Sequence, residues 1–152
     1  MAETAVISTL VNQATKLSAP FTETAAARLQ SELFGAGRAA RSSDIVIFNA
    51  ADVDLHLHRT ECQWGGYSTD LFPETEIPSK KSSVYGIESN GFLSGVTCST
   101  TYESEDGKSR VQFLVENYIN STATADLKVI ETLGQGNNNQ VRFLIKSRND
   151  RG

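Results

Sequence analysis

Basic residues are few and scattered in this sequence. There are 14 lysines and arginines against 18 aspartates and glutamates, and the formal net charge is −4 at pH 7. The nearest approach to a basic cluster consists of Arg38 and Arg41 with the C-terminal Lys146, Arg148 and Arg151. Because binding to a phosphate backbone requires concentrated positive charge, we expect no nucleic acid partner.

Long apolar runs are missing too. No stretch approaches the roughly 20 apolar residues of a membrane-spanning helix. Glu3 stands where a signal peptide carries positive charge, and no long apolar segment follows it. We therefore expect no signal peptide in this chain. A mature secreted protein has the same features, so the sequence is compatible with secretion.

Cysteine is almost as scarce, with two residues in the chain. Cys62 and Cys98 could form one disulfide, which in the chain-entropy model would stabilise the fold by roughly 3–4 kcal/mol. Two buried free thiols are the alternative. The sequence leaves both interpretations open.

The two histidines lie close together in the segment "DLHLH". Asp54, His56 and His58 share one face of a predicted strand, so a metal site of two histidines and one carboxylate is geometrically possible. In the alternative interpretation the three residues form the solvent-exposed face opposite Leu55 and Leu57. Nothing else in the sequence supplies a definite further ligand.

Catalytic motifs are otherwise absent. There is no GxSxG, and "LGQGNNN" at 133–139 precedes a predicted strand, whereas a P-loop opens a helix and carries Lys-Ser/Thr. We therefore expect no enzyme and no cofactor. A metal-dependent enzyme that uses the face of Asp54, His56 and His58 remains the catalytic alternative.

The whole chain is expected to form one domain, and it begins with a helical segment, residues 3–37. Pro20 interrupts the helical pattern, Thr22 is a predicted cap of a second helix, and Gly35 and Gly37 end that helix. We expect the first helix to pack on its own domain, with docking to a membrane interface or a partner groove as the alternative. Its apolar face consists of Ile7, Leu10, Val11, Ala14 and Leu17.

From residue 44 to residue 147 the hydrophobic period changes to two. Short strands with no helix between them predict an antiparallel architecture, because parallel strands would need crossover helices. We expect a mainly β protein: an antiparallel β-sandwich of about seven or more strands, preceded by one or two amphipathic helices. The predicted strands are 44–50, 53–64, 81–88, 95–103, 110–118, 125–132 and 140–147.

Alternation within these strands predicts the core of the sandwich. Cys62 differs in parity from Leu57, so placing both side chains inside requires a β-bulge between them. Gly86, Gly91 and Gly95 are predicted to turn corners and to allow close approach of backbones. The predicted core residues are Val53, Leu55, Leu57, Val96, Cys98, Tyr102, Val111, Phe113, Val115, Leu127, Val129, Val141, Phe143 and Ile145.

Aromatic residues gather in the stretch "QWGGYSTDLFPETEIP", which also carries glycine and proline. Trp64, Tyr67 and Phe72 are the predicted contact residues, because a lone tryptophan on a glycine-rich loop offers apolar area together with one hydrogen-bond donor. Tyr118 is a further candidate. A plug that closes one end of the sandwich is the alternative role of this cluster.

Residues 44–130 resemble a known group of proteins in the order of their motifs. A first strand ends at Asn49, a Gly-aromatic loop contains Ile77-Pro78, and an "ES-G-xx-G" segment from Glu88 leads to a strand with Tyr102. The following "RVQFLVENYINSTATADLKV" is similar to that group's next strand, loop and returning strand. The chain thus resembles the actinoporin-like and aegerolysin-like β-sandwich proteins of the cytolysin type.

The resemblance implies a protein that recognises membrane lipid head groups and that has pore-forming potential. It is similar to the actinoporin layout in placing an amphipathic helix before the sandwich, and in that layout the helix inserts into the membrane. We expect a secreted, non-enzymatic toxin or effector that contacts lipid through Trp64, Tyr67, Phe72 and Tyr118, with homo-oligomers allowed. In the alternative, a secreted effector or inhibitor binds a protein partner, such as a host enzyme, through the same loops.

Overall fold

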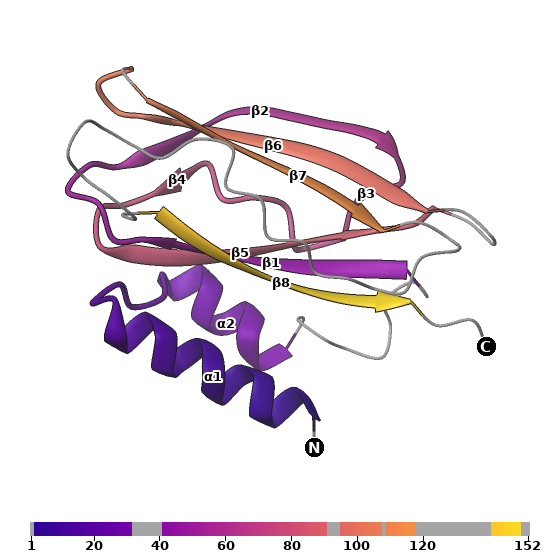
Figure 1. Ribbon diagram of the computed structural model, residues 1–152, viewed down its shortest axis with the longest axis horizontal. Coiled ribbons are helices and arrows are strands. Elements are labelled where there is room, and N and C mark those ends of the chain that lie inside the picture. The colour runs from indigo at the N-terminus through magenta and orange to yellow at the C-terminus, as the bar shows by residue number, and fades with distance from the viewer. Residues whose placement is uncertain (1, 32–40, 91–94, 108, 118–140, 150–152) are drawn as a thin grey trace.

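The structure is a computed structural model, which describes residues 2–31, 41–90, 95–107, 109–117 and 141–149. Two helices and two four-stranded antiparallel sheets stack in three layers (Figure 1). The predicted mainly β sandwich with N-terminal helices is confirmed. The elements are α1 (Ala2–Lys16), α2 (Glu23–Ser31), β1 (Arg41–Asn49), β2 (Leu55–Trp64), β3 (Gly66–Tyr67), β4 (Glu76–Ile77), β5 (Lys81–Glu88), β6 (Val96–Ser104), β7 (Arg110–Asn117) and β8 (Val141–Asn149).

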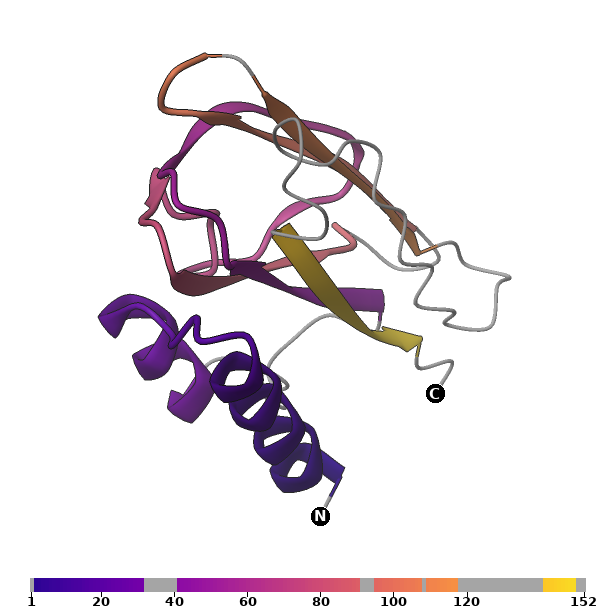
Figure 2. The same cartoon turned by 60° about the vertical axis from the view of Figure 1, so that its left-hand side comes forward.

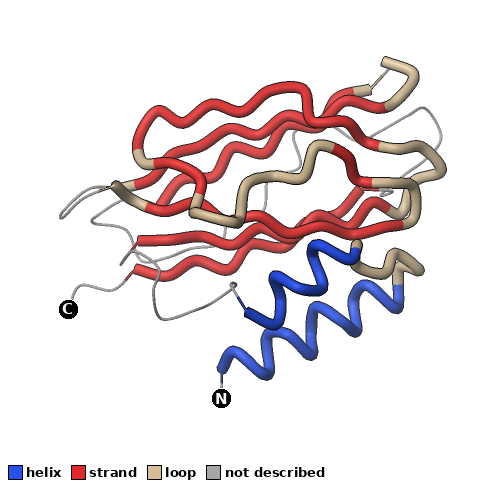
Figure 3. The backbone as a smooth tube through the Cα atoms, turned by 180° about the vertical axis from the view of Figure 1, so that it is seen from behind, coloured by secondary structure: helices blue, strands red, loops and turns tan. Residues whose placement is uncertain are grey.

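The two sheets are named here sheet A, with the strand order β3-β5-β1-β8, and sheet B, with the order β4-β2-β6-β7. Seen from behind, loops at the margin of the sandwich connect strands of one sheet to strands of the other (Figure 3). Six of the seven predicted strands are present with small shifts of their ends. The predicted strand 125–132 lies outside the described residues.

Sheet A is covered on both faces. Strand β1 is buried along its whole length, since Ile45 and Ile47 pack in the cluster between the sheets while Val46 and Phe48 pack in the cluster under the helices. Both helices lie on the face of sheet A that is turned away from sheet B (Figure 2). A strand covered on both faces reads as an unbroken apolar run, as "IVIF" at 45–48 does.

The N-terminal helices follow the sequence prediction closely. Helix α1 ends before Ser18, which has a positive φ of 54°. Thr22 caps α2, because its Oγ1 accepts a hydrogen bond of 3.1 Å from the amide of Ala25. Gly35 and Gly37, the predicted end of this helix, lie outside the described residues.

The apolar faces of the helices pack on their own domain, as expected. Leu10 and Ala14 of α1 are buried, and Ile7 and Leu17 are half-buried. Val11, which the periodicity placed on the same face, is 46% exposed. A helix that packs on a sheet buries only part of a wide apolar stripe, and Val11 lies beyond that part.

The cluster between the sheets contains most of the predicted core. Val53, which precedes β2, and Leu57, which packs against this cluster, are only half-buried. Leu127, Val129 and the side chain of Phe143 lie outside the described part of the protein. The predicted residues that are buried are Leu55, Val96, Cys98, Tyr102, Val111, Phe113, Val115, Val141 and Ile145.

The β-bulge predicted between Leu57 and Cys62 is present. Leu57 pairs with Tyr102 and Arg59 pairs with Thr101, so His58 is the additional residue. This insertion changes the parity of the strand and turns Cys62 toward the core. The bulge also places two neighbouring polar side chains, at positions 58 and 59, at the outer face of sheet B.

Cys62 and Cys98 are joined by a disulfide. They are directly paired across β2 and β6, with their Cα atoms 4.0 Å apart. The bond therefore ties neighbouring strands within sheet B and not the two sheets to each other. The free-thiol alternative does not apply to this structure.

One corner of the sandwich is made by Gly65, which joins β2 of sheet B to β3 of sheet A. Its φ is +73°, and an added Cβ would lie 2.6 Å from the carbonyl oxygen of Glu88. Gly86, a predicted corner residue, lies instead within β5, where it exchanges backbone hydrogen bonds with Ser68 and Leu71. Gly86 therefore allows the loop of Ser68 and Leu71 to approach β5 closely and does not form a turn. Gly91 lies outside the described residues, and Gly95 directly precedes β6.

Removal of the disulfide is expected to lower the free energy of unfolding. Replacing both Cys62 and Cys98 with alanine should cost about 3–4 kcal/mol, since the bond joins residues separated by 36 positions. Urea denaturation of the wild type in oxidising and reducing buffer measures the same loss, and the double variant should not respond to the reductant. An equal urea midpoint for the oxidised and reduced wild type would contradict the prediction.

The packing of α1 can be tested with adjacent residues. Leu10→Ala should lower the free energy of unfolding by about 2–5 kcal/mol, because Leu10 is fully buried. Val11→Ala is the matched control and should change it by less than about 0.5 kcal/mol. Equal effects of the two substitutions in urea denaturation would mean that α1 does not pack on sheet A in solution.

Candidate functional site

Trp64 stands directly before the Gly65 turn, Tyr67 follows it in β3, and Phe72 packs against Tyr67; we call these three residues the aromatic corner. Trp64, the last residue of β2, is 59% exposed, and Phe72 is 46% exposed. These are the two large aromatic residues that the described part of the chain leaves most exposed. Exposed rings of this size are typical of contact surfaces, because their burial against a partner removes a large apolar area from water.

Tyr67 holds the corner in place from inside. Its ring centroid lies 5.0 Å from that of Phe72, edge to face, and 6.1 Å from that of buried Tyr85. Its hydroxyl donates to the carbonyl oxygen of Ser99 at 3.1 Å and lies 2.9 Å from Oγ1 of Thr100. Burial raises the pKa of the Tyr67 phenol, and the hydrogen bond with Thr100 offsets part of that rise. Tyr67 therefore supports Phe72 and is not itself fully available for contact.

The segment that carries Phe72 is fixed by hydrogen bonds to three other elements. The Glu74 carboxylate accepts from the hydroxyls of Thr22, at 2.8 Å, and of Ser83. The Tyr102 hydroxyl of sheet B donates to the Glu74 carbonyl oxygen at 2.6 Å. These bonds join the loop to α2, β5 and β6, so Phe72 is presented from a well-anchored backbone.

Asp54 and Tyr118 are two further residues that the sequence singled out. Tyr118 lies outside the described residues. Asp54 precedes β2, and its Oδ1 accepts a hydrogen bond of 2.7 Å from the amide of Ser79. The carboxylate of Asp54 thus stabilises the turn before β5.

The histidines are exposed at the outer face of sheet B. His58 Nδ1 lies 3.1 Å from a carboxylate oxygen of Glu103, and His56 pairs in register with Glu103 on one side and Glu76 on the other. Within the described residues no three His, Cys, Asp or Glu side chains converge as a metal ion requires. The metal-site alternative is therefore without a complete ligand set in that part of the chain.

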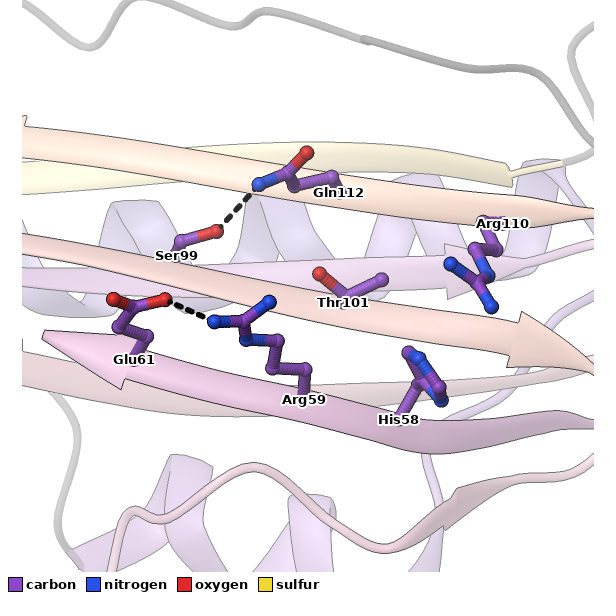
Figure 4. A pocket seen from close by; sticks show the side chains of 7 residues that line it. All are labelled: His58, Arg59, Glu61, Ser99, Thr101, Arg110 and Gln112. Atoms are coloured by element: carbon purple, nitrogen blue, oxygen red, sulfur yellow. Dashed lines mark hydrogen bonds and ion pairs between the residues drawn. The ribbon is translucent and has the colours of Figure 1, made fainter.

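A polar hollow with a volume of about 340 Å³ lies on the outer face of sheet B (Figure 4). Its lining comes from three neighbouring strands: His58, Arg59 and Glu61 from β2, Ser99 and Thr101 from β6, and Arg110 and Gln112 from β7. Arg59 and Glu61 form an ion pair of 3.0 Å, and Gln112 Nε2 donates to Ser99 Oγ at 2.7 Å. The helices lie behind sheet A, on the opposite side of the molecule from this hollow.

Sequence reasoning did not single out the polar hollow. The alternation in "TCSTTYES" and "RVQFLVEN" already marks every second residue as outward-facing. What the alternation does not give is which outward residue of one strand lies beside which of the next. The register brings Arg59, Thr101 and Gln112 into one row across the sheet.

Comparison with family models, curated proteins and solved structures found no match to this chain. The resemblance to cytolysin-type sandwiches thus remains a prediction from the sequence. Neither described helix has the length and hydrophobicity needed to cross a membrane.

The buried tyrosines give the protein a predictable response to alkaline pH. Burial raises the pKa of Tyr85 and of Tyr102 above the usual value of 10.0. The unfolded chain loses these protons near pH 10 while the folded protein keeps them, so the contribution of the two tyrosines to stability is constant below that pH and falls above it. The free energy of unfolding should decrease by about 1.4 kcal/mol per pH unit for each of the two residues.

Urea denaturation between about pH 9 and about pH 11.5 measures this slope, with phenolate absorbance as an independent signal. Tyr85→Phe should remove the contribution of one residue and make the slope smaller. A free energy of unfolding that is constant or rises across this interval would contradict the assignment.

Proposed function

We propose that the protein is a non-enzymatic binding protein that recognises membrane lipid head groups with the aromatic corner. The observation that carries the proposal is the exposure of Trp64, 59%, at a turn whose backbone is fixed on both sides. Tryptophan favours the interface between water and lipid, because its ring is apolar and its indole N–H needs a polar partner. Phe72 adds apolar area in the same part of the fold.

The aromatic corner is held in place before binding, so little conformational entropy is lost when it binds. Gly65 fixes the direction of the chain after Trp64, and Cys62, two residues earlier, is tied to β6 by the disulfide. Tyr67 holds Phe72 from below through the ring contact described above. A preorganised contact surface binds more tightly than a mobile one of equal area, because less conformational entropy is lost.

Charge favours neutral or zwitterionic lipids as the target. The protein has a net charge of −4 and no dense basic patch in its sequence. Attraction to anionic membranes requires clustered lysines and arginines close to the surface. Binding through the corner should therefore depend on apolar contact and hydrogen bonding, and only weakly on salt concentration.

The disulfide supports a secreted protein, since such bonds persist in oxidising compartments. A secreted toxin or effector is consistent with that location. Pore formation would be a separate, later step, because the apolar face of α1 is buried against sheet A. For α1 to insert into lipid, Leu10 and Ala14 must first leave this cluster.

Co-sedimentation with vesicles of phosphatidylcholine and sphingomyelin tests the proposal. Trp64→Ala should weaken binding by about tenfold, because the ring would no longer be transferred out of water. Phe72→Ala should act in the same direction. Val11→Ala is the matched control, since Val11 is apolar and 46% exposed but lies on α1.

Binding that survives Trp64→Ala and Phe72→Ala, or no binding to these vesicles, would contradict the proposal. Surviving binding would place lipid recognition on another surface, whereas no binding would make a protein partner for the same corner the leading hypothesis. Dye release from vesicles that do bind the protein tests the pore-forming step.

A further inference from the structure

We propose that the polar hollow on sheet B is a binding site for a neutral saccharide. This inference does not rest on the proposed lipid function, because the hollow and the aromatic corner are made of different residues. The hollow lies on three neighbouring strands, so its side chains are positioned by the regular spacing of a sheet (Figure 4).

The strand register arranges the outward side chains in rows. His56, Glu103 and Arg110 form one row across β2, β6 and β7. Arg59, Thr101 and Gln112 form the next, with His58 of the bulge beside it. Each row brings at least one hydrogen-bond donor next to a group that can accept. A ligand that both donates and accepts at closely spaced positions fits such a surface.

The charges of the hollow balance, and this decides the class of ligand. Arg59 and Arg110 are opposed by Glu61 of the lining and by Glu103 at its rim. With neutral histidine, the sum of these four charges is zero. A site for phosphate or sulfate needs an excess of positive charge, and a site for a metal cation needs converging acceptors. Neither condition is met among the described residues of this surface.

Three contacts hold the polar groups in place before any ligand arrives. The Glu103 carboxylate lies 3.1 Å from His58 Nδ1 and 3.6 Å from Arg110 Nε, so one acidic side chain orients two basic ones. Gln112 donates to Ser99 at 2.7 Å, which fixes the amide plane across two strands. Groups positioned in this way lose little entropy on binding.

The pair of Arg59 and Glu61 is suited to bind hydroxyl groups, since the guanidinium donates hydrogen bonds and the carboxylate accepts them. Their side chains are 69% and 63% exposed, so their ion pair of 3.0 Å contributes little to stability. Breaking this ion pair to bind a ligand therefore requires little free energy. Sugar hydroxyls on adjacent carbons each donate and accept, and they can bind a guanidinium and a carboxylate side by side through charge-assisted hydrogen bonds.

The size of the hollow agrees with this class of ligand. Its volume of about 340 Å³ is at the lower end of the range of about 300–1,000 Å³ for small-molecule sites. Every lining residue carries a polar group, so a purely apolar ligand would leave donors and acceptors beneath it unpaired. A neutral sugar unit, free in solution or carried by a glycolipid, is small enough for this volume and offers hydroxyl groups to the polar lining.

The test uses the full chain and a panel of neutral sugars: glucose, galactose, mannose, N-acetylglucosamine, lactose and cellobiose. Saturation-transfer NMR detects binding in solution, and immobilised neutral oligosaccharides extend the panel. Inorganic phosphate and glucose 6-phosphate are the anionic comparisons. Vesicles with galactosylceramide, set against phosphatidylcholine vesicles, distinguish a glycolipid source from a soluble one.

The informative variant is Arg59→Gln with Glu61→Gln, which leaves the net charge unchanged. It should weaken sugar binding by about tenfold or more, because two charge-assisted hydrogen bonds are lost. Asp52→Asn with Lys80→Gln is the matched control. It removes another exposed ion pair, of 3.5 Å, that lies outside the hollow. Thr101→Val, which keeps the shape of the side chain, should also weaken binding.

Sugar binding that the double variant weakens and the control retains supports the proposal. Failure of every neutral sugar to bind, binding that the double variant leaves unchanged, or preferential binding of the anionic compounds would each overturn it. Plain phosphatidylcholine–sphingomyelin vesicles report separately on the aromatic corner, so failure of one proposal does not imply failure of the other.

Discussion

The architecture depends on the burial of both faces of sheet A. Strand β1 places apolar side chains alternately toward sheet B and toward the helices, and every residue of the strand is buried. A sheet with two apolar faces cannot be stable with one of them in water, since burial of apolar area is the main term that favours folding. The helices are therefore a structural layer of the domain. The described residues cover sheet B on one side only, so its outer face is polar where they leave it open.

That asymmetry explains where the two candidate sites lie. The polar hollow occupies the outer face of sheet B, the side of the sandwich on which solvent-facing residues are least constrained by packing. The aromatic corner lies where the chain passes from sheet B to sheet A, and its turn depends on Gly65. The anchors of that corner, Tyr67 and Glu74, connect both sheets and α2. The hydrogen bonds of Tyr67 and Glu74 thus both stabilise the fold and hold the segment that carries Phe72.

Sequence reasoning succeeded where the signal is local. The Thr22 cap, the interruption at Pro20 and the period-two strands depend on a few neighbouring residues, and the structure confirms them. The bulge before Cys62 could also be predicted, because two inward residues of opposite parity require an inserted residue. The corner at Gly65 was not recognised, since "QWGGY" reads as a loop until the following residues are known to pair with β5.

The sequence by itself determined the class of the fold and the identity of most core residues, because hydrophobic period and residue type are local properties. Only the tertiary structure decided which polar side chains share the hollow, that Asp54 binds a turn, and that Cys62 and Cys98 are neighbours across sheet B. These facts follow from strand order and register. Register is set by the packing of many distant residues at once, and no short stretch of sequence contains it.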